Sequence, residues 1–109
     1  MLKRSSRLRA GEVAVVVRQG KALRARFLSA KILNHGSATI RAAAVVPKSV
    51  AKTAVARNRM RRALYRAFAT HIPSSAKGFD IVFFLRTLPS DTTLIAQDVE
   101  TILHLLPRS

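Results

Sequence analysis

Residues 48–68, KSVAKTAVARNRMRRALYRAF, place the strongest constraint on how this chain can fold. From residue 53 onward, the apolar side chains recur at a helical period of about 100° per residue. They fall on one arc, made of Ala56, Met60, Ala63, Leu64, Ala67 and Phe68. Thr53 precedes the stripe, and its hydroxyl suits it to be the N-cap. The pattern predicts an amphipathic helix that ends near His71, with one face on a core and the other exposed.

The exposed face of this helix and the linker before it carry charge of one sign only. The segment has no acidic residue, and its basic residues are Lys48, Lys52, Arg57, Arg59, Arg61, Arg62 and Arg66. A merely solvated face usually mixes both signs, because like charges four residues apart repel. Arginine forks match phosphate groups, and Asn58 can donate and accept beside them. These eight residues are the candidate polyanion-binding set.

The charge of the whole chain supports the same prediction. The net charge is +15, and residues 1–79 contain 18 basic residues against a single acidic one, Glu12. Such a charge attracts RNA, DNA or an anionic membrane. Residues 80–109 carry two basic and four acidic residues, so we expect them to serve as scaffold. The length predicts one domain, residues 1–109, in which residues 1–8 form a basic arm that either contacts phosphates or is solvated.

The remaining pattern predicts an α+β fold with a small sheet. Residues 26–33 alternate, with Phe27, Ser29 and Lys31 on the side opposite the apolar residues, which is typical of a half-buried strand. A turn at 34–36 leads to a second strand at 39–46, expected in the sheet interior. Residues 79–85 form a third, and a helix with an apolar stripe begins at 89–91 and stops at Pro107. Residues 12–18 fit a strand or a helix.

A self-sufficient active site is not evident in the sequence. The three histidines share no metal-ligand spacing, the carboxylates include no obvious pair, and there is no phosphate-binding glycine loop. No metal or other cofactor is therefore expected on the protein. Polyanion binding leaves three functions open at this point: a general or ribosome-associated RNA-binding protein, a protein-only nuclease, and membrane-surface binding. The absence of cysteine fits a reducing compartment, and no apolar run is long enough to span a membrane.

The segment KSVAKTAVARNRMRR resembles the signature of the bacterial ribonuclease P protein component. The matching residues are Lys48, Ala54, Val55, Arg57, Asn58, Arg59, Arg61 and Arg62. The resemblance extends over nearly the full chain, from an Arg7-Leu8-Arg9 segment and Gly20 to an apolar strand followed by Arg86 and a last helix. It implies that residues 12–18 are helical and that the element order is α-β-β-α-β-α around a mostly antiparallel sheet. It also implies a βαβ crossover, left-handed in this family.

The resemblance further implies a function. The chain would be a cytoplasmic subunit of ribonuclease P that binds the catalytic RNA and precursor tRNA and promotes 5′ maturation. Catalysis would belong to the magnesium-dependent RNA, with no catalytic protein residue and no small-molecule substrate. A cleft between the first helix and the sheet would hold the single-stranded 5′ leader. The positions expected at that cleft are Val13, Val17, Phe27, Lys31 and Arg86. Relatives often carry phenylalanines at the positions of Val13 and Val17 and an aromatic residue on the following strand, at the position of Lys31 or Ala30. Phe27 is expected to compensate in part if it faces the cleft.

Overall fold

Three helices and four strands make up the protein in a computed structural model that describes residues 6–36, 39–72 and 78–106. In chain order they are α1 (Ala10–Gln19), β1 (Lys21–Arg24), β2 (Leu28–Asn34), β3 (Arg41–Val45), α2 (Ala54–His71), β4 (Phe79–Leu85) and α3 (Thr92–His104). The predicted loop at 74–78 lies almost wholly outside the described residues, as do Pro107 and most of the arm at 1–8.

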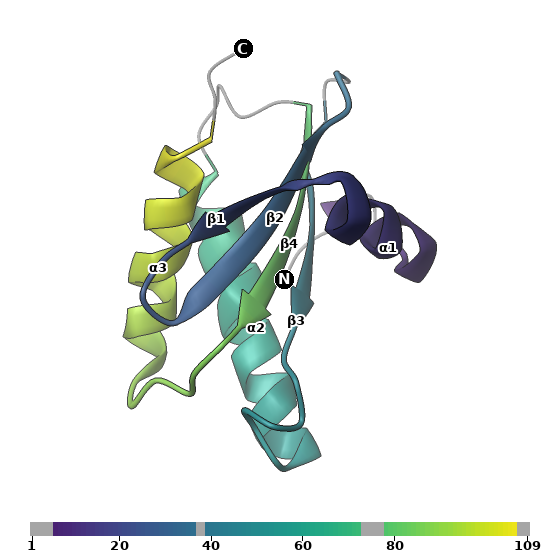
Figure 1. Cartoon of the computed structure of the whole chain (residues 1–109). Coiled ribbons are helices and arrows are strands. Elements are labelled where there is room, and N and C mark those ends of the chain that lie inside the picture. The colour runs from purple at the N-terminus through teal and green to yellow at the C-terminus, as the bar shows by residue number, and fades with distance from the viewer. Residues whose placement is uncertain (1–5, 37–38, 73–77, 107–109) are drawn as a thin grey trace.

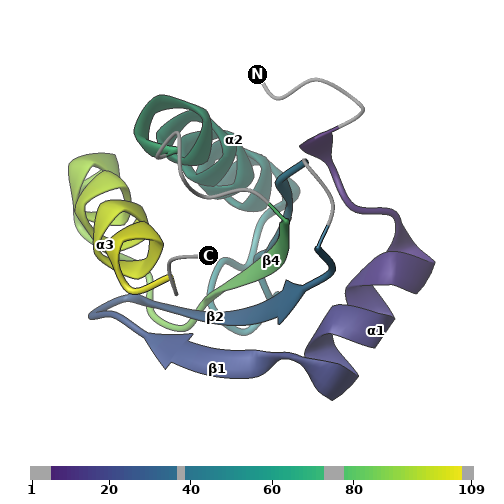
Figure 2. The same ribbon diagram turned by 90° about the horizontal axis from the view of Figure 1, so that it is seen from above.

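The strands form one sheet in the order β1-β2-β4-β3 (Figure 1). The β1–β2 and β2–β4 pairs are antiparallel, whereas β3 and β4 are parallel and are joined through α2. Helices α2 and α3 cover one face of the sheet, and α1 packs on the other (Figure 2). The predicted α+β class, the mostly antiparallel sheet and the βαβ crossover are confirmed, while the left hand of the crossover stays a prediction.

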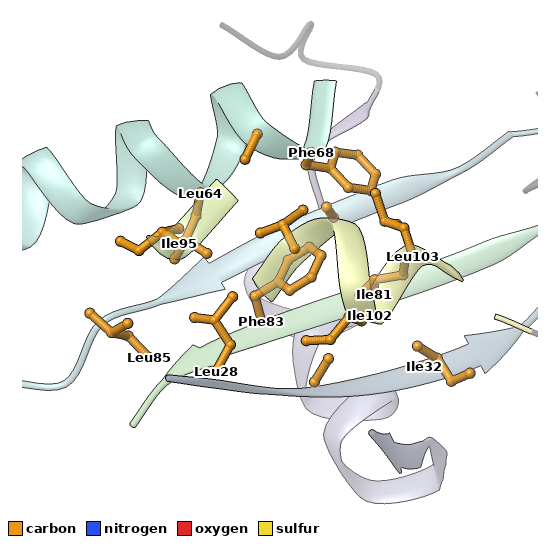
Figure 3. Close-up of a cluster of buried hydrophobic side chains, with 14 of the residues drawn as sticks. Leu28, Ile32, Leu64, Phe68, Ile81, Phe83, Leu85, Ile95, Ile102 and Leu103 are labelled. Atoms are coloured by element: carbon orange, nitrogen blue, oxygen red, sulfur yellow. The ribbon is translucent and has the colours of Figure 1, made fainter. Parts of the chain in front are cut away.

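The main core lies between the sheet and the pair α2–α3 (Figure 3). Alternation in β4 sends Phe79, Ile81, Phe83 and Leu85 into this core, and Phe68 of α2 meets Phe83 edge-to-face at a centroid distance of 5.9 Å. The helices contribute the apolar stripes predicted from the sequence. In α2 the buried members are Met60, Leu64, Ala67 and Phe68, and in α3 they are Ile95, Val99, Ile102 and Leu103. Burial of these stripes fixes which side of α2 faces outward.

A smaller cluster holds α1 against the opposite face of the sheet. Val16 is buried against Ala43 and Val82, so residues 12–18 are helical, as the resemblance implies. The helix ends at Gly20, whose N–H donates to the Val16 carbonyl at 2.7 Å. A Cβ at Gly20 would stand 2.5 Å from the Val16 oxygen and 2.7 Å from the Ile32 oxygen. Only glycine therefore lets the chain turn this sharply from α1 into β1.

Strand β1 was not predicted. The observed element order is α-β-β-β-α-β-α, whereas the predicted order was α-β-β-α-β-α. Its sequence, KALR, has no β-branched or aromatic residue and suits a helix as well as a strand. The four residues become a strand because they pair in register with β2, from Lys21 opposite Ile32 to Arg24 opposite Ser29. Tertiary pairing overrides the local preference here.

The prediction that the second strand lies in the sheet interior was wrong, because β3 is an edge strand. Its small apolar residues are buried by α1 on one face and by α2 on the other, and this burial mimics a central position. Two contacts cover its open edge. The N–H of Leu8 donates to the Ala42 carbonyl at 2.9 Å, and the N–H of Ala44 donates to the Tyr65 hydroxyl at 3.1 Å. The edge is thus closed against pairing with another chain.

An ionic cluster joins α1 to the sheet. Arg41 of β3 forms a bidentate pair with the buried Asp80, at 3.0 and 2.8 Å, and also pairs with Glu12 of α1. The Nε2 atom of His35 lies 3.1 Å from the Oδ1 atom of Asp80. The hydrogen bond from the Arg9 N–H lowers the pKa of Glu12, and Arg41 adds to this effect. The hydrogen bond to Asp80 raises the pKa of Arg41 above its ordinary value.

The lowered pKa of Glu12 predicts how stability depends on pH. A carboxylate whose pKa is lowered by folding stabilises the protein above its unfolded-state pKa, and this contribution disappears as the pH falls through the folded-state value. We therefore expect Glu12→Gln to be less stable than the wild type near pH 7. The difference should shrink as the pH falls below about 5. Urea denaturation across this range measures the difference, with the exposed Glu100→Gln as control. A gap that stays constant from pH 7 to pH 3 would contradict the assignment.

Candidate nucleic-acid interface

Helix α2 presents three arginines on its outward side. Thr53 caps the helix as predicted, with its hydroxyl accepting from the Ala56 N–H at 3.0 Å. Because the apolar stripe is locked into the core, Arg59, Arg62 and Arg66 are exposed. All three line a hollow of about 170 Å³ beside Thr92 at the start of α3, and Arg59 also borders an adjoining hollow of about 540 Å³. These arginines therefore converge on one groove between α2 and α3.

The other predicted residues of α2 make contacts within the protein. The guanidinium of Arg57 donates to the carbonyls of Ala51 and Lys52, at 3.1 and 3.2 Å, and so ties the linker to the helix. Asn58 accepts a hydrogen bond from Arg61, which directs that guanidinium along the helix surface. Lys48 and Lys52 lie exposed in the linker that leads into the helix. Arg57 thus also holds the linker against the helix, and Asn58 also orients Arg61.

The positive charge of this surface is not neutralised within the described part of the chain. The ion pairs found among residues 6–36, 39–72 and 78–106 connect His35, Arg41, Glu12 and Asp80, and none of them includes a cation of α2. Arg62 and Arg66 are one helical turn apart and repel each other. Binding of an external polyanion is therefore favourable, because the polyanion supplies the missing negative charge.

Tyr65 lies among the arginines of α2 in the sequence, but its side chain is directed at the sheet. It is half-buried against the core, and its hydroxyl closes the edge of β3. By accepting the hydrogen bond of a strand N–H, the Tyr65 hydroxyl has a structural role. The same hydrogen bond holds α2 close to β3.

The sheet face beside α1 holds four of the five residues expected at the leader cleft. Both valines belong to α1: Val13 is half-buried on the side of the helix that packs on the sheet, whereas Val17 is 38% exposed. Lys31 pairs in register with Val82 and so shares the α1 face of the sheet. Arg86 is exposed just beyond β4, and its Nε donates to the Ser29 hydroxyl at 2.7 Å. These four residues are brought together on one side of the molecule, opposite the α2–α3 layer.

The structure does not bring Phe27 to this face. Phe27 lies in the β1–β2 turn and packs against the main core, so it cannot compensate for the aromatic residues missing from α1. The aromatic ring on the α1 face is Phe84, which the sequence interpretation overlooked. The signal was available: in FDIVFFL the alternation sends Asp80, Val82 and Phe84 to the side opposite the core-facing phenylalanines.

The described residues contain no group of three His, Asp or Glu side chains suited to hold a metal ion. Where Glu12, Asp80 and His35 come near each other, the Arg41 guanidinium binds both carboxylates. No helix among the described residues is long and apolar enough to cross a membrane.

An unneutralised arginine helix and a second cationic sheet face, both carried by a small α+β scaffold, define a basic RNA-binding protein. The family model described as Ribonuclease P matches residues 2–106. The ribonuclease P protein component of Pseudanabaena sp. (strain PCC 6903) is 36% identical over 107 residues, covering 94% of this chain and 92% of that protein. The corresponding protein of Clostridioides difficile (strain 630) is 37% identical over 79 residues, covering 72% of this chain and 68% of that protein. The chain belongs to the ribonuclease P protein family, whose members take part in the 5′ maturation of tRNA.

Solved structures agree with the fold. The ribonuclease P protein of Thermotoga maritima superposes with a TM-score of 0.79 at 23% identity, covering 93% of this chain and 97% of that chain. The protein from Staphylococcus aureus gives a TM-score of 0.78 at 23% identity, covering 92% and 94%. The four-strand mixed sheet with three helices is therefore the family architecture.

Proposed function

We propose that this chain is the RNA-binding subunit of ribonuclease P and contacts two RNA molecules with opposite faces. The α2 face and the linker before it, which together hold the eight residues predicted from the sequence, bind the catalytic RNA. The sheet face beside α1, with Val17, Lys31 and Arg86, binds the 5′ leader of precursor tRNA. The holoenzyme works in the cytoplasm. The observation that carries the proposal is the arginine face of α2, which lacks an acidic partner among the described residues and lies on a helix that the core holds rigidly.

The chemical step in this proposal belongs to the RNA, with magnesium held there. Metal-assisted cleavage by the protein would need a cluster of carboxylates around the metal. In the described residues, Arg41 binds Asp80 and Glu12, while Asp98 accepts hydrogen bonds from backbone N–H groups. The protein then contributes affinity and orientation. Phosphate contacts dominate that affinity, so binding should weaken steeply with salt.

Reconstitution tests this proposal. Precursor tRNA is incubated at low magnesium with the protein alone, with a bacterial ribonuclease P RNA alone, and with both. We expect release of the 5′ leader to be faster with both than with the RNA alone, and no release with the protein alone. Tight RNA binding without faster release would favour a general RNA-binding protein. Cleavage by the protein alone would overturn the assignment of catalysis to the RNA.

A further inference from the structure

Phe84 lies in a row of residues that crosses the sheet on its α1 face. The strand registers place Arg24 opposite Ser29, Ser29 opposite Phe84, and Val45 beside Phe84. Residues paired in this way point to the same side of the sheet. Phe84 packs against the small cluster of Val16, Ala43 and Val82 but is only half-buried.

Three cations share the face of the sheet that carries this ring. The guanidinium carbon of Arg86 lies 5.1 Å from the centroid of Phe84, and its Nε is held by the Ser29 hydroxyl. Arg24 is in the same row, and Lys31 is in the next row of the same face. All three cations lie outside the ion pairs found among the described residues. A half-buried aromatic ring covered by an exposed cation, with further unpaired cations on the same face, is suited to a single-stranded nucleotide, whose base stacks while its phosphates bind the positive charges.

The turn between β1 and β2 offers an internal comparison. There Arg26 lies over the ring of Phe27, also at 5.1 Å. Phe27, however, packs against the main core on the other face of the sheet. The Arg26–Phe27 and Arg86–Phe84 pairs have the same guanidinium-to-ring distance but lie on opposite faces of the sheet. Only the Arg86–Phe84 pair is on the face that carries Lys31 and α1.

We propose that Phe84 is the stacking platform for one base of the single-stranded leader, and that Arg86 covers the ring in the free protein. When the leader binds, the base takes the place of the guanidinium on the ring, and Arg86 pairs with a backbone phosphate. The ring on β4 thereby supplies the aromatic surface that α1 lacks in this chain. The identity of the strand as the tRNA leader rests on the proposed function, whereas stacking of a single-stranded base on Phe84 does not.

The first test measures stacking with the protein alone. A short single-stranded RNA that carries one 2-aminopurine is titrated with wild type, Phe84→Leu, Phe84→Tyr and the control Phe27→Leu. Stacking quenches the fluorescence of this base. We expect quenching by wild type, Phe84→Tyr and Phe27→Leu, and its loss in Phe84→Leu. Arg86→Gln should keep the quenching and flatten the dependence of log K on log salt by about 0.7, the value of one single-strand phosphate contact.

The second test uses the holoenzyme. Precursor tRNA with a natural leader, with one abasic leader nucleotide at successive positions, or without a leader is bound by each variant. We expect Phe84→Leu to weaken binding of the leader-bearing substrate by about 5- to 100-fold and to leave mature tRNA unaffected. At one leader position, the abasic substitution should weaken binding to wild type and have no further effect on Phe84→Leu. Phe84→Tyr should restore the wild-type affinity.

The outcomes separate the two proposals. If the wild-type protein accelerates cleavage but Phe84→Leu and Phe27→Leu behave alike in both assays, the platform is wrong and the proposed function stands. If quenching depends on Phe84 but the protein does not accelerate cleavage, the platform stands and its assignment to the leader is wrong. Thermal melts of all variants show whether a lost signal reflects unfolding, and normal quenching by Phe84→Tyr excludes a packing effect.

Discussion

Replacing Arg59, Arg62 and Arg66 together by Gln should reduce the affinity for the catalytic RNA about 100-fold and leave the fold intact. The three guanidinium groups line one groove and lack an acidic partner among the described residues. A phosphate contact contributes about 1 kcal/mol, so three contacts correspond to about two powers of ten. The slope of log K against log salt should also become shallower by about 3. Filter binding at several salt concentrations measures both quantities.

The matched control for this variant removes the same charge elsewhere. Arg18, Lys21 and Arg26 are exposed on α1, on β1 and in the turn after β1, away from α2. Replacing these three by Gln lowers the net charge by the same amount, and we expect at most a small loss of affinity. The α2 variant should melt no lower than the wild type, because the Arg62–Arg66 repulsion is removed. Equal losses of affinity in the two triple variants would mean that total charge, rather than the α2 face, determines binding.

Asp98→Ala should lower the free energy of unfolding by about 3 kcal/mol. Asp98 of α3 is only 7% exposed, and its carboxylate accepts hydrogen bonds from the backbone N–H groups of Phe27 and Leu28. It thereby ties α3 to the start of β2. Hydrogen bonds to a charged group contribute about 1.5–3 kcal/mol each, and alanine would leave two donors without an acceptor. Urea denaturation measures the loss.

Two further variants make the Asp98 result interpretable. Asp98→Asn keeps an acceptor oxygen, so we expect an intermediate loss. Glu100→Ala removes a carboxylate that is exposed on the same helix and should change stability by no more than about 0.5 kcal/mol. If Asp98→Ala and Glu100→Ala were equally stable, the link between α3 and β2 would contribute nothing to the fold.

The elements that could be predicted from the sequence are those whose own residues specify them. The apolar stripes of α2 and α3 were evident because the helical period is a local signal. Capping chemistry is local as well, and it identified Thr53 as the cap of α2. The alternation in β2 was evident for the same reason, and β4 was evident as a run of apolar residues. These signals also identified the exposed arginines of α2, because a helix with a buried stripe leaves only one side for its charges.

The features that were missed depend on neighbours distant in sequence. The residues of β1 become a strand only by pairing with β2, and the edge position of β3 depends on which strand lies beside it. Tyr65 shares its side of α2 with arginines, but β3 lies within reach of its hydroxyl. Alternation within β4 was sufficient to assign Phe84 to the α1 face. The packing of Phe27 against the main core, by contrast, is visible only in the three-dimensional arrangement.

The central claim, that opposite faces bind the catalytic RNA and the leader, is tested most directly by cleavage from tethered iron. The chain has no cysteine, so a single introduced cysteine can carry an iron chelate that cuts nearby RNA. Val55→Cys labels the arginine side of α2, where Val55 is 78% exposed, Val17→Cys labels α1, and Glu100→Cys on α3 is the control. In the holoenzyme with precursor tRNA, we expect cuts in the catalytic RNA from position 55, cuts in the leader from position 17, and few from position 100. Leader cuts from position 55 and none from position 17 would contradict the account.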